Sequence, residues 1–353
     1  GEPDFQTPWM VRKAAVDSLE RKRMVYTANS GMADLRQEIC NYLKRKYDLT
    51  YHPENETLVT VGGSEAIDLA IRAIVNPGDE VLIVEPSFVC YKPIVELMHG
   101  MAIPISTQLK NKFKLTAEEL RSHITERTKL LILPYPNNPT GGIMTREDLE
   151  AIAEVLRDTN VLVLSDEIYS ELTYGRKHVS IASIDGMWER TIYVSGFSKA
   201  FAMTGWRLGY VCAPEPIAKQ MLKIHQYAIM SAPTLSQYAA IVALRECDKE
   251  VQKMVDEYNR RRRMLVDGFN RIGLTCFNPE GAFYMFPCIR SIGMSSEEFC
   301  ETLLQEEKVA VVPGNAFGES GEGFVRVSYA YSLKHLQEAL VRIERFVNRH
   351  RGE

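Results

Sequence analysis

Several features that would mark a secreted, metal-binding or membrane protein are missing from this sequence of 353 residues. The seven cysteines are odd in number and never spaced C-x-x-C, and the seven histidines form no H-x-x-x-H pair. These absences argue against a disulfide framework and a zinc site, and scattered thiols are typical of a cytoplasmic enzyme. No apolar run approaches the roughly 18 residues that a membrane helix needs, and no signal peptide is visible. We therefore expect a cytoplasmic protein with no bound metal and no membrane span.

The charge of the chain is nearly balanced, with a net charge of −4 and a pI near 6.1. Hydrophobic residues make up 45% and charged residues 25%, as in ordinary globular proteins, and neither nucleic acid nor an anionic membrane is expected as a partner. The basic run at 260–263 lies in a long helical pattern, so it is interpreted as a solvated helix face. The chain is long enough for two lobes rather than one compact core.

Strand-length apolar runs alternate with helical patterns through the middle of the chain, which predicts a mostly parallel α/β sheet buried on both faces. The expected strands are 57–61, 80–84, 129–133, 161–165, 191–194 and 208–212, and the expected helices are 64–75, 145–157 and 214–227. A long helix at 249–271, strands at 282–286 and 324–328 and a last helix at 332–349 then predict a smaller α+β lobe. The first helix, 8–22, is expected to join that lobe. The predicted domains are 26–245 for the large one, and 1–25 with 246–353 for the small one.

Two clusters of turn-forming residues follow expected strands, where ligands gather in sheets of this kind. The cluster GGSEA at 62–66 stands before an apolar helix, so its free N–H groups can hold a phosphate. The cluster PNNPTG at 136–141 is a rigid loop in which Asn138 can donate its amide to a ligand oxygen. Taken alone, the first is better explained as an N-cap by Ser64 with a helix start, and a rigid turn is a sound explanation of the second.

Four single residues carry a charge or a hydrogen-bond donor in a sequence context that suggests contact with a ligand. Asp166 directly follows the apolar run VLVLS and requires a cation such as a pyridinium nitrogen, while Tyr169 can reach a phenolate oxygen of the same ring. Lys199 lies in an apolar stretch, and a desolvated lysine is a nucleophile toward an aldehyde. Arg207 offers a planar fork for a phosphate. The plainer alternatives are a helix cap for Asp166, packing for Tyr169, snorkelling for Lys199 and a surface ion pair for Arg207.

One ligand explains these clusters together better than separate structural roles do. A phosphate cradle, a donor to a phenol oxygen, a buried carboxylate and an amine nucleophile are the contacts that pyridoxal 5′-phosphate (PLP) requires. The motifs that accompany them are GEPDFQTP at 1–8, YTANSGMADLR at 26–36, GGSEAI at 62–67, PNNPTG at 136–141, SDEIY at 165–169, SKAFAMTGWRLGY at 198–210, GAFY at 281–284, VVPG at 311–314 and VRVSYA at 325–330. In this order, and over nearly the whole chain, they resemble the class I aminotransferases of fold type I, in the aspartate/aromatic aminotransferase-like branch.

The resemblance implies a fold and a set of catalytic residues. The implied fold is the fold type I PLP-dependent transferase, with a large domain built on a mostly parallel seven-stranded sheet flanked by helices and a smaller α+β domain. Lys199 is implied as the lysine that forms an aldimine with PLP and shuttles the proton. Asp166 is implied as the partner of the ring nitrogen, and Asn138 and Tyr169 as contacts of the ring's phenolate oxygen.

The resemblance also implies the residues that bind the cofactor and the substrate. The implied phosphate contacts are Gly63, Ser64, Ser198 and Arg207, together with Tyr26 from the neighbouring subunit of a homodimer with shared active sites. Phe88 is implied to stack on the ring. Arg326 is implied to hold the substrate α-carboxylate, with help from Asn138 and the Gly1 backbone.

The activity implied is ping-pong transfer of an amino group from an L-amino acid to a 2-oxo acid, with 2-oxoglutarate as the expected acceptor. Aromatic, methionine-like, aspartate and acylated diamino acid donors all remain open. The nearest alternative is a PLP-dependent carbon–sulfur β-lyase of the same fold. A regulatory module that retains the pocket, and an NAD-type oxidoreductase, are further alternatives, but no G-x-G-x-x-G follows the first strand. The chain begins at Gly1 where family members carry a few tens of earlier residues, so we expect an N-terminal arm outside this sequence.

Overall fold

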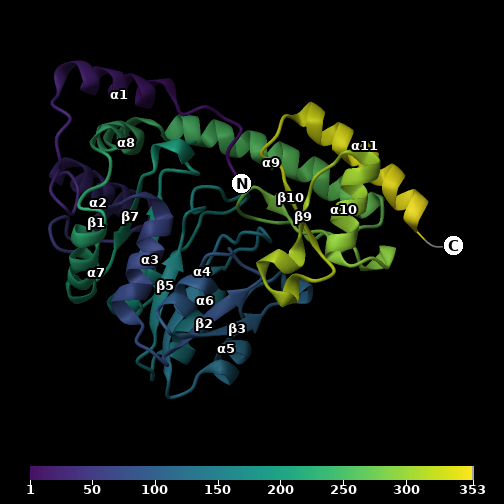
Figure 1. Cartoon of the computed structure of the whole chain (residues 1–353), viewed down its shortest axis with the longest axis horizontal. Helices are drawn as coiled ribbons and strands as arrows, with labels where there is room; N and C mark the ends of the chain where they lie inside the picture. The colour runs from purple at the N-terminus through teal and green to yellow at the C-terminus, as the bar shows by residue number, and fades with distance from the viewer. Residues whose placement is uncertain (352–353) are drawn as a thin grey trace.

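A computed structural model describes residues 1–351 of the chain, which are organised around a seven-stranded sheet (Figure 1). The strands lie in the order β1-β7-β6-β5-β4-β2-β3, and β7 runs antiparallel to both of its neighbours while the other pairs are parallel. The bounds are β1 Thr57–Thr60, β2 Glu80–Glu85, β3 Met101–Ser106, β4 Thr128–Leu133, β5 Leu162–Asp166, β6 Thr191–Gly196 and β7 Gly209–Cys212. The mostly parallel α/β sheet predicted from the sequence is confirmed.

Helices cover both faces of this sheet, which explains why its central strands contain continuous apolar runs. In β4, Leu130 and Ile132 pack in a cluster with α3 (Gly62–Ile74), α4 (Tyr91–Leu97) and α7 (Glu215–Ala228). The alternate residues, Leu131 and Leu133, pack on the other face with α5 (Ala117–His123) and α6 (Arg146–Leu156). Successive side chains of a strand point to opposite faces, so a strand covered on both sides needs an uninterrupted apolar run.

A second group of helices packs beside the sheet and leads toward the C-terminal part of the chain. They are α1 (Trp9–Arg21), α2 (Ala33–Tyr47), α8 (Thr234–Glu246) and α9 (Asp248–Arg271). The first helix was expected to join the small lobe, but α1 packs mainly against α8, in the range expected for the large lobe (Figure 1). The segment before it does reach α9, because Arg261 forms an ion pair with Asp4 at 2.8 Å. We therefore propose that α1 belongs to the large domain, and we keep 26–245 and 246–353 as the proposed ranges of the large and small domains.

The C-terminal elements form a smaller α+β unit at the end of α9 that lies away from α8 (Figure 1). Its three-stranded antiparallel sheet has the order β8-β10-β9, with β8 Tyr284–Met285, β9 Val312–Pro313 and β10 Val325–Ser328. The helices α10 (Ser296–Glu307) and α11 (Leu333–His350) pack on each other and α11 packs on α9. This unit brings β10 and the turn Gly314–Phe317 toward the carboxyl ends of the large sheet.

The basic run at 260–263 is only partly the solvated face that the sequence predicted, because Arg260 and Arg263 are exposed and the two arginines between them are not. Arg261 and Arg262 are buried, at 5% and 7% exposed. Arg261 pairs with Asp4 and Glu257, and Arg262 donates to Asn259 and to the Pro279 carbonyl. Their charges are tolerated in the interior because each guanidinium has several acceptors. Among residues 1–351, no helix is long and apolar enough to cross a membrane, and no cluster of three potential metal ligands occurs.

Candidate active site

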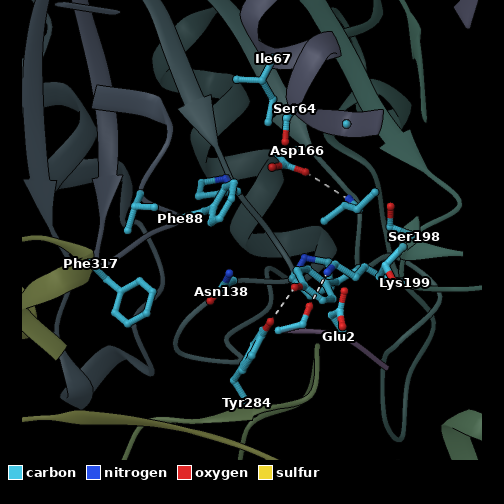
Figure 2. Close-up of a pocket in the computed structure, with 18 of the residues that line it drawn as sticks. Glu2, Ser64, Ile67, Phe88, Asn138, Asp166, Ser198, Lys199, Tyr284 and Phe317 are labelled. Carbon is cyan, nitrogen blue, oxygen red and sulfur yellow. Dashed lines mark hydrogen bonds between the residues drawn. The ribbon is translucent and has the colours of Figure 1, made fainter. Parts of the chain in front are cut away.

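A cavity of about 750 Å³ opens at the carboxyl ends of the large sheet, where the small unit meets it (Figure 2). Its lining comes from the segments that follow β1, β2, β4, β5 and β6, and from β8, β9 and β10 with the turn after β9. In open α/β sheets this edge is the general location of ligand sites. The sequence-predicted residues that line it are Gly1, Gly63, Ser64, Phe88, Asn138, Asp166, Tyr169, Ser198, Lys199, Arg207 and Arg326.

The first part of the cavity is a cradle for an anion at the start of α3. Gly62, at φ +75°, turns the chain from β1 into the helix, so Gly63 and Ser64 present the first N–H groups of the helix to the cavity. A Cβ on Gly62 would lie 2.6 Å from Nη2 of Arg207, so the guanidinium lies directly against this turn. Ser198 also lines the cavity. A helix N-terminus, a hydroxyl and an arginine fork together suit a phosphate.

The turn that forms this cradle is fixed by a close backbone contact with β7. A Cβ on Gly209 would lie 2.5 Å from the carbonyl carbon of Gly62 and 2.6 Å from the nitrogen of Gly63. Only glycine therefore fits at position 209 without moving the cradle. Sequence reasoning placed Gly209 in the matching motif but gave it no role.

Asp166 ends β5 inside the cavity, 7% exposed. Its Oδ1 accepts the backbone N–H of Ile168 at 3.2 Å, and its Oδ2 accepts the phenol of Tyr91 at 2.6 Å. Burial raises the pKa of the Asp166 carboxyl above its ordinary value, and these two hydrogen bonds act against that rise. A cation facing this carboxylate would therefore be favourable. Tyr91 was missed in the sequence, because a tyrosine in an apolar helix start is indistinguishable from a core residue.

Lys199 lies on the turn after β6 and points across the cavity. Its Nζ donates to the Gly1 carbonyl at 2.6 Å and lies 5.9 Å from the ring centroid of Tyr169. The pKa of Lys199 is lowered to about 8, mainly by burial; the positive charges of Arg207 and Arg326 also lower it, whereas Glu2 and Asp166 act in the opposite direction. This lysine therefore holds a large neutral fraction near neutral pH, as a nucleophile must.

Polar contacts join the large sheet to the small unit across the cavity, through Tyr169 and Tyr284 and through Asn138 and Arg326. The hydroxyls of Tyr169 and Tyr284 are 3.0 Å apart, and Asn138 Oδ1 accepts from Nη1 of Arg326 at 3.0 Å. Asn138 is only 9% exposed, and its amide lies at the cavity wall (Figure 2). Tyr284 belongs to the GAFY motif quoted from the sequence, but its contact with Tyr169 was not anticipated, because the two are distant in the chain.

Arg326 is held in a sandwich of two aromatic rings. Its guanidinium carbon lies 4.6 Å from the ring centroid of Tyr284 and 4.7 Å from that of Phe317. Its Nε is buried and has no hydrogen-bond partner among residues 1–351. A buried guanidinium nitrogen without an acceptor is costly unless an anion completes it, so the geometry suits a carboxylate ligand.

Of the two remaining predicted residues, Phe88 lines the cavity and Tyr26 does not. Phe88 lines the cavity and packs edge-on against Tyr91, with 6.1 Å between ring centroids. Tyr26 lies apart from the lining residues, and its side chain is 80% exposed. Its contact with the site of a neighbouring subunit stays a prediction.

The arrangement fits PLP on the chemistry of its donors. An anion cradle at Gly63, Ser64 and Arg207, a partly neutral amine at Lys199 and a buried carboxylate at Asp166 are the three contacts that the phosphate, the aldehyde and the ring nitrogen need. The unpartnered Nε of Arg326 leaves one further anion site beside them. Fold and cavity together define a PLP-dependent enzyme of the α/β class.

Comparison with known proteins identifies the family. Residues 1–343 match the family "Aminotransferase class I and II", so the chain belongs to this family of PLP-dependent enzymes and is an aminotransferase acting on amino acids and 2-oxo acids. It is 53% identical to the putative aminotransferase YugH of Bacillus subtilis (strain 168), over 99% of this chain and 90% of that protein. It is 45% identical to the aspartate aminotransferase of Pyrococcus abyssi (strain GE5 / Orsay), over 98% and 90% of the two chains. The crystal structure of an aromatic aminotransferase from Pyrococcus horikoshii OT3 matches with a TM-score of 0.97 at 43% identity, over 99% and 94%.

Proposed function

We propose that this aminotransferase works through Lys199 as the residue that captures the cofactor and moves the proton at the substrate's Cα. When bound, PLP supplies an electron-accepting ring conjugated to a reactive aldehyde. Asp166 would hold the ring nitrogen and favour its protonated form, because a buried carboxylate favours a cationic partner. Lys199, once free, acts as general base and then as general acid at the substrate. The two half-reactions follow a ping-pong scheme with 2-oxoglutarate as the acceptor.

The observation that carries these assignments is the meeting of three cations and one buried carboxylate in a single cavity. Lys199, Arg207 and Arg326 are the cationic side chains of the lining, and Asp166 faces them from the end of β5. Arg207 is assigned to the cofactor phosphate because it lies against the helix start at Gly62. Arg326 is assigned to the substrate α-carboxylate, because its Nε has no acceptor within the described part of the chain and it neighbours Asn138.

The donor that this cavity fits best carries an apolar or aromatic side chain. The three lining cations are all assigned, so none of the described lining residues is left to pair with a second carboxylate. The rest of the wall is mainly apolar, and Glu2 adds a negative charge; the apolar members include Ile67, Phe88, Val89, Ile168, Val312 and Phe317. Burying an unpaired carboxylate against such a wall is costly, whereas an apolar side chain gains from it. We propose at least a tenfold preference in kcat/KM for phenylalanine or methionine over aspartate.

A screen of amino donors against 2-oxoglutarate tests the activity and the donor class. The expected result is 2-oxo acid formation that depends on the acceptor, with the highest kcat/KM for apolar donors. Release of pyruvate and ammonia from cystathionine without an acceptor would instead indicate the β-lyase. Lys199→Ala is expected to abolish turnover, and Lys177→Ala, an exposed lysine outside the cavity, serves as the matched control. Near-wild-type transamination by Lys199→Ala would refute the assignment of the lysine.

The second subunit is proposed to dock near Tyr26. Exposed apolar side chains lie on the segments 24–26 and 227–230. These segments are close in space, because Thr234 Oγ1, shortly after the second segment, donates to the Val25 carbonyl at 2.7 Å. The exposed side chains are Met24, Val25 and Tyr26 on one segment and Tyr227, Ile229 and Met230 on the other. Such a patch is expected to be covered by a partner, here a second copy of the chain whose Tyr26 reaches the phosphate cradle.

Mixed dimers test whether sites are shared. A Lys199→Ala subunit paired with a Tyr26→Ala subunit contains one site in which both residues are intact. At limiting PLP, the mixture is therefore expected to be more active than either variant alone. A mixture no more active than its parents, or a monomer in sedimentation velocity, would contradict the shared site.

A cytoplasmic location is also proposed. All seven cysteines lie within the described residues and carry free thiols, which supports a reducing compartment. Fractionation of the source cells with an antibody against the protein tests this proposal.

A further inference from the structure

The carboxylate proposed for the ring nitrogen does not stand alone, because a buried phenol from another element fixes it. Tyr91 is the first residue of α4 and is 1% exposed. Its hydroxyl donates to Asp166 Oδ2 at 2.6 Å, a distance typical of a hydrogen bond to a charged oxygen. Among residues 1–351, Tyr91 is the side chain that donates to Asp166, and the second donor is the backbone N–H of Ile168.

The same tyrosine contacts the residue proposed to stack on the ring. Phe88 lies three residues before Tyr91, in the loop that leads into α4, and the two rings meet edge to face at an angle of 84°. Tyr91 also lines the cavity itself. One side chain therefore contacts both the carboxylate and the aromatic ring between which the pyridine ring would lie.

Tyr91 is suited to act as a fixed donor and not as an acid. Burial raises the pKa of the Tyr91 phenol well above its ordinary value, and the charge of Asp166 raises it further. The hydroxyl therefore keeps its proton at every physiological pH. A hydrogen bond between a neutral donor and a carboxylate restricts the rotation of the carboxylate, which positions the remaining lone pairs of Asp166 for a partner in the cavity.

We propose that Tyr91 is a positioning residue for the cofactor: it holds Asp166 and Phe88 in the geometry that binds the pyridine ring. This inference rests on the proposed role of Asp166. It requires that loss of the hydroxyl alone weakens cofactor binding, although the ring of Tyr91 remains in place. It also requires that the effect passes through Asp166 and disappears when that carboxylate is absent.

The test is the dissociation constant of PLP, measured by titrating the apoprotein, for Tyr91→Phe, Asp166→Ala and the double variant. Tyr91→Phe is expected to raise the dissociation constant about tenfold, the value of one hydrogen bond to a charged group. In the Asp166→Ala background the same change is expected to add less than twofold. With saturating PLP, kcat of Tyr91→Phe is expected to fall, while KM for the amino donor stays within twofold, since Arg326 is not affected.

Tyr135→Phe is the matched control, because Tyr135 is a buried phenol outside the cavity whose hydroxyl donates to the Phe113 carbonyl at 2.7 Å. It is expected to leave the PLP dissociation constant unchanged, and thermal melting of each apoprotein verifies that the variants fold. If Asp166→Ala weakens PLP binding and Tyr91→Phe does not, Tyr91 is only a core residue and the inference is wrong. If Asp166→Ala itself leaves PLP binding unchanged, the proposed role of Asp166 fails.

Discussion

The reactivity of Lys199 should depend on pH in a way that the cavity dictates. Burial lowers the pKa of Lys199 to about 8, and the positive charges of Arg207 and Arg326 contribute to the shift. A lysine in water has a pKa of about 10.4. At pH 7.5 a group with a pKa of about 8 is about one-quarter neutral, whereas an ordinary lysine is about one part in a thousand neutral. Lys199 should therefore react with PLP about two hundred times faster than an exposed lysine of equal intrinsic nucleophilicity.

The assay is the initial rate at which the apoprotein captures PLP covalently, read after borohydride reduction and peptide mapping. Because the neutral amine is the reactive form, the rate at Lys199 is expected to rise about tenfold per pH unit below pH 8 and to level off above it. Adducts on exposed lysines of the same sample provide the internal control, and their rates should still be rising at pH 10. The PLP concentration is kept low so that binding is not saturated.

The pH profile distinguishes a lowered pKa of Lys199 from a raised one. A lysine stabilised as an ammonium ion by Asp166 and Glu2 would have a raised pKa, and its rate would keep increasing to pH 10 or beyond. A rate at Lys199 that parallels the exposed lysines over the whole range would therefore refute the argument that burial and the two arginines dominate. Replacing Arg207 by Gln removes one positive charge, and the midpoint of the profile should then move upward.

Three further substitutions test other contacts of the cavity. Arg326→Lys keeps the charge but loses the planar fork, so KM for the amino donor should rise about a hundredfold in steady-state kinetics with the PLP dissociation constant unchanged; an unchanged KM would contradict the carboxylate assignment. Phe317→Ala removes one face of the aromatic sandwich around Arg326, and KM for the donor should rise about fivefold, which an unaltered KM would disprove. Gly209→Ala places a methyl group 2.5 Å from the Gly62 carbonyl carbon, so PLP affinity should fall about a hundredfold by titration of the apoprotein; wild-type affinity would show that the cradle is not fixed by β7.

The large sheet was predictable from the sequence because its strands are buried on both faces. β4 and β5 each contain an uninterrupted apolar run, LLIL and LVL, and the expected ranges 129–133 and 161–165 differ from the observed strands by one residue at one end of β4 and at both ends of β5. β3 was not predicted, since it is the edge strand and most of its residues are at least partly exposed. Helices α2 and α8 were missed because their apolar stripes are interrupted by polar residues that are satisfied only in the folded chain, such as Arg36 and Gln237.

The candidate site was predictable to the extent that its residues belong to motifs with a known chemistry. Nine of the eleven cavity residues named from the sequence lie together because they end or follow strands of the large sheet, which converge at one edge; Gly1 comes from the N-terminal segment and Arg326 from β10 of the small sheet. Tyr91 and Phe317 could not be found in this way, since an aromatic residue in an apolar context predicts only burial. The pairing of Arg261 with Asp4 was equally invisible, because it joins residues 257 positions apart. Long-range partners of a charged residue are a property of the fold, and its local pattern does not contain them.

The balance of charge in the cavity links cofactor binding to the state of Lys199. Three cations share the lining with Asp166 and Glu2 as the acidic side chains, so the protein alone leaves positive charge uncompensated. An anion held against Arg207 at the start of α3 would cancel part of the charge that lowers the pKa of Lys199, and a carboxylate on Arg326 would do the same. The lysine is therefore most reactive before either anion site is filled. It gains proton affinity as they fill, which is the change that a residue needs to become a proton carrier after it has served as a nucleophile.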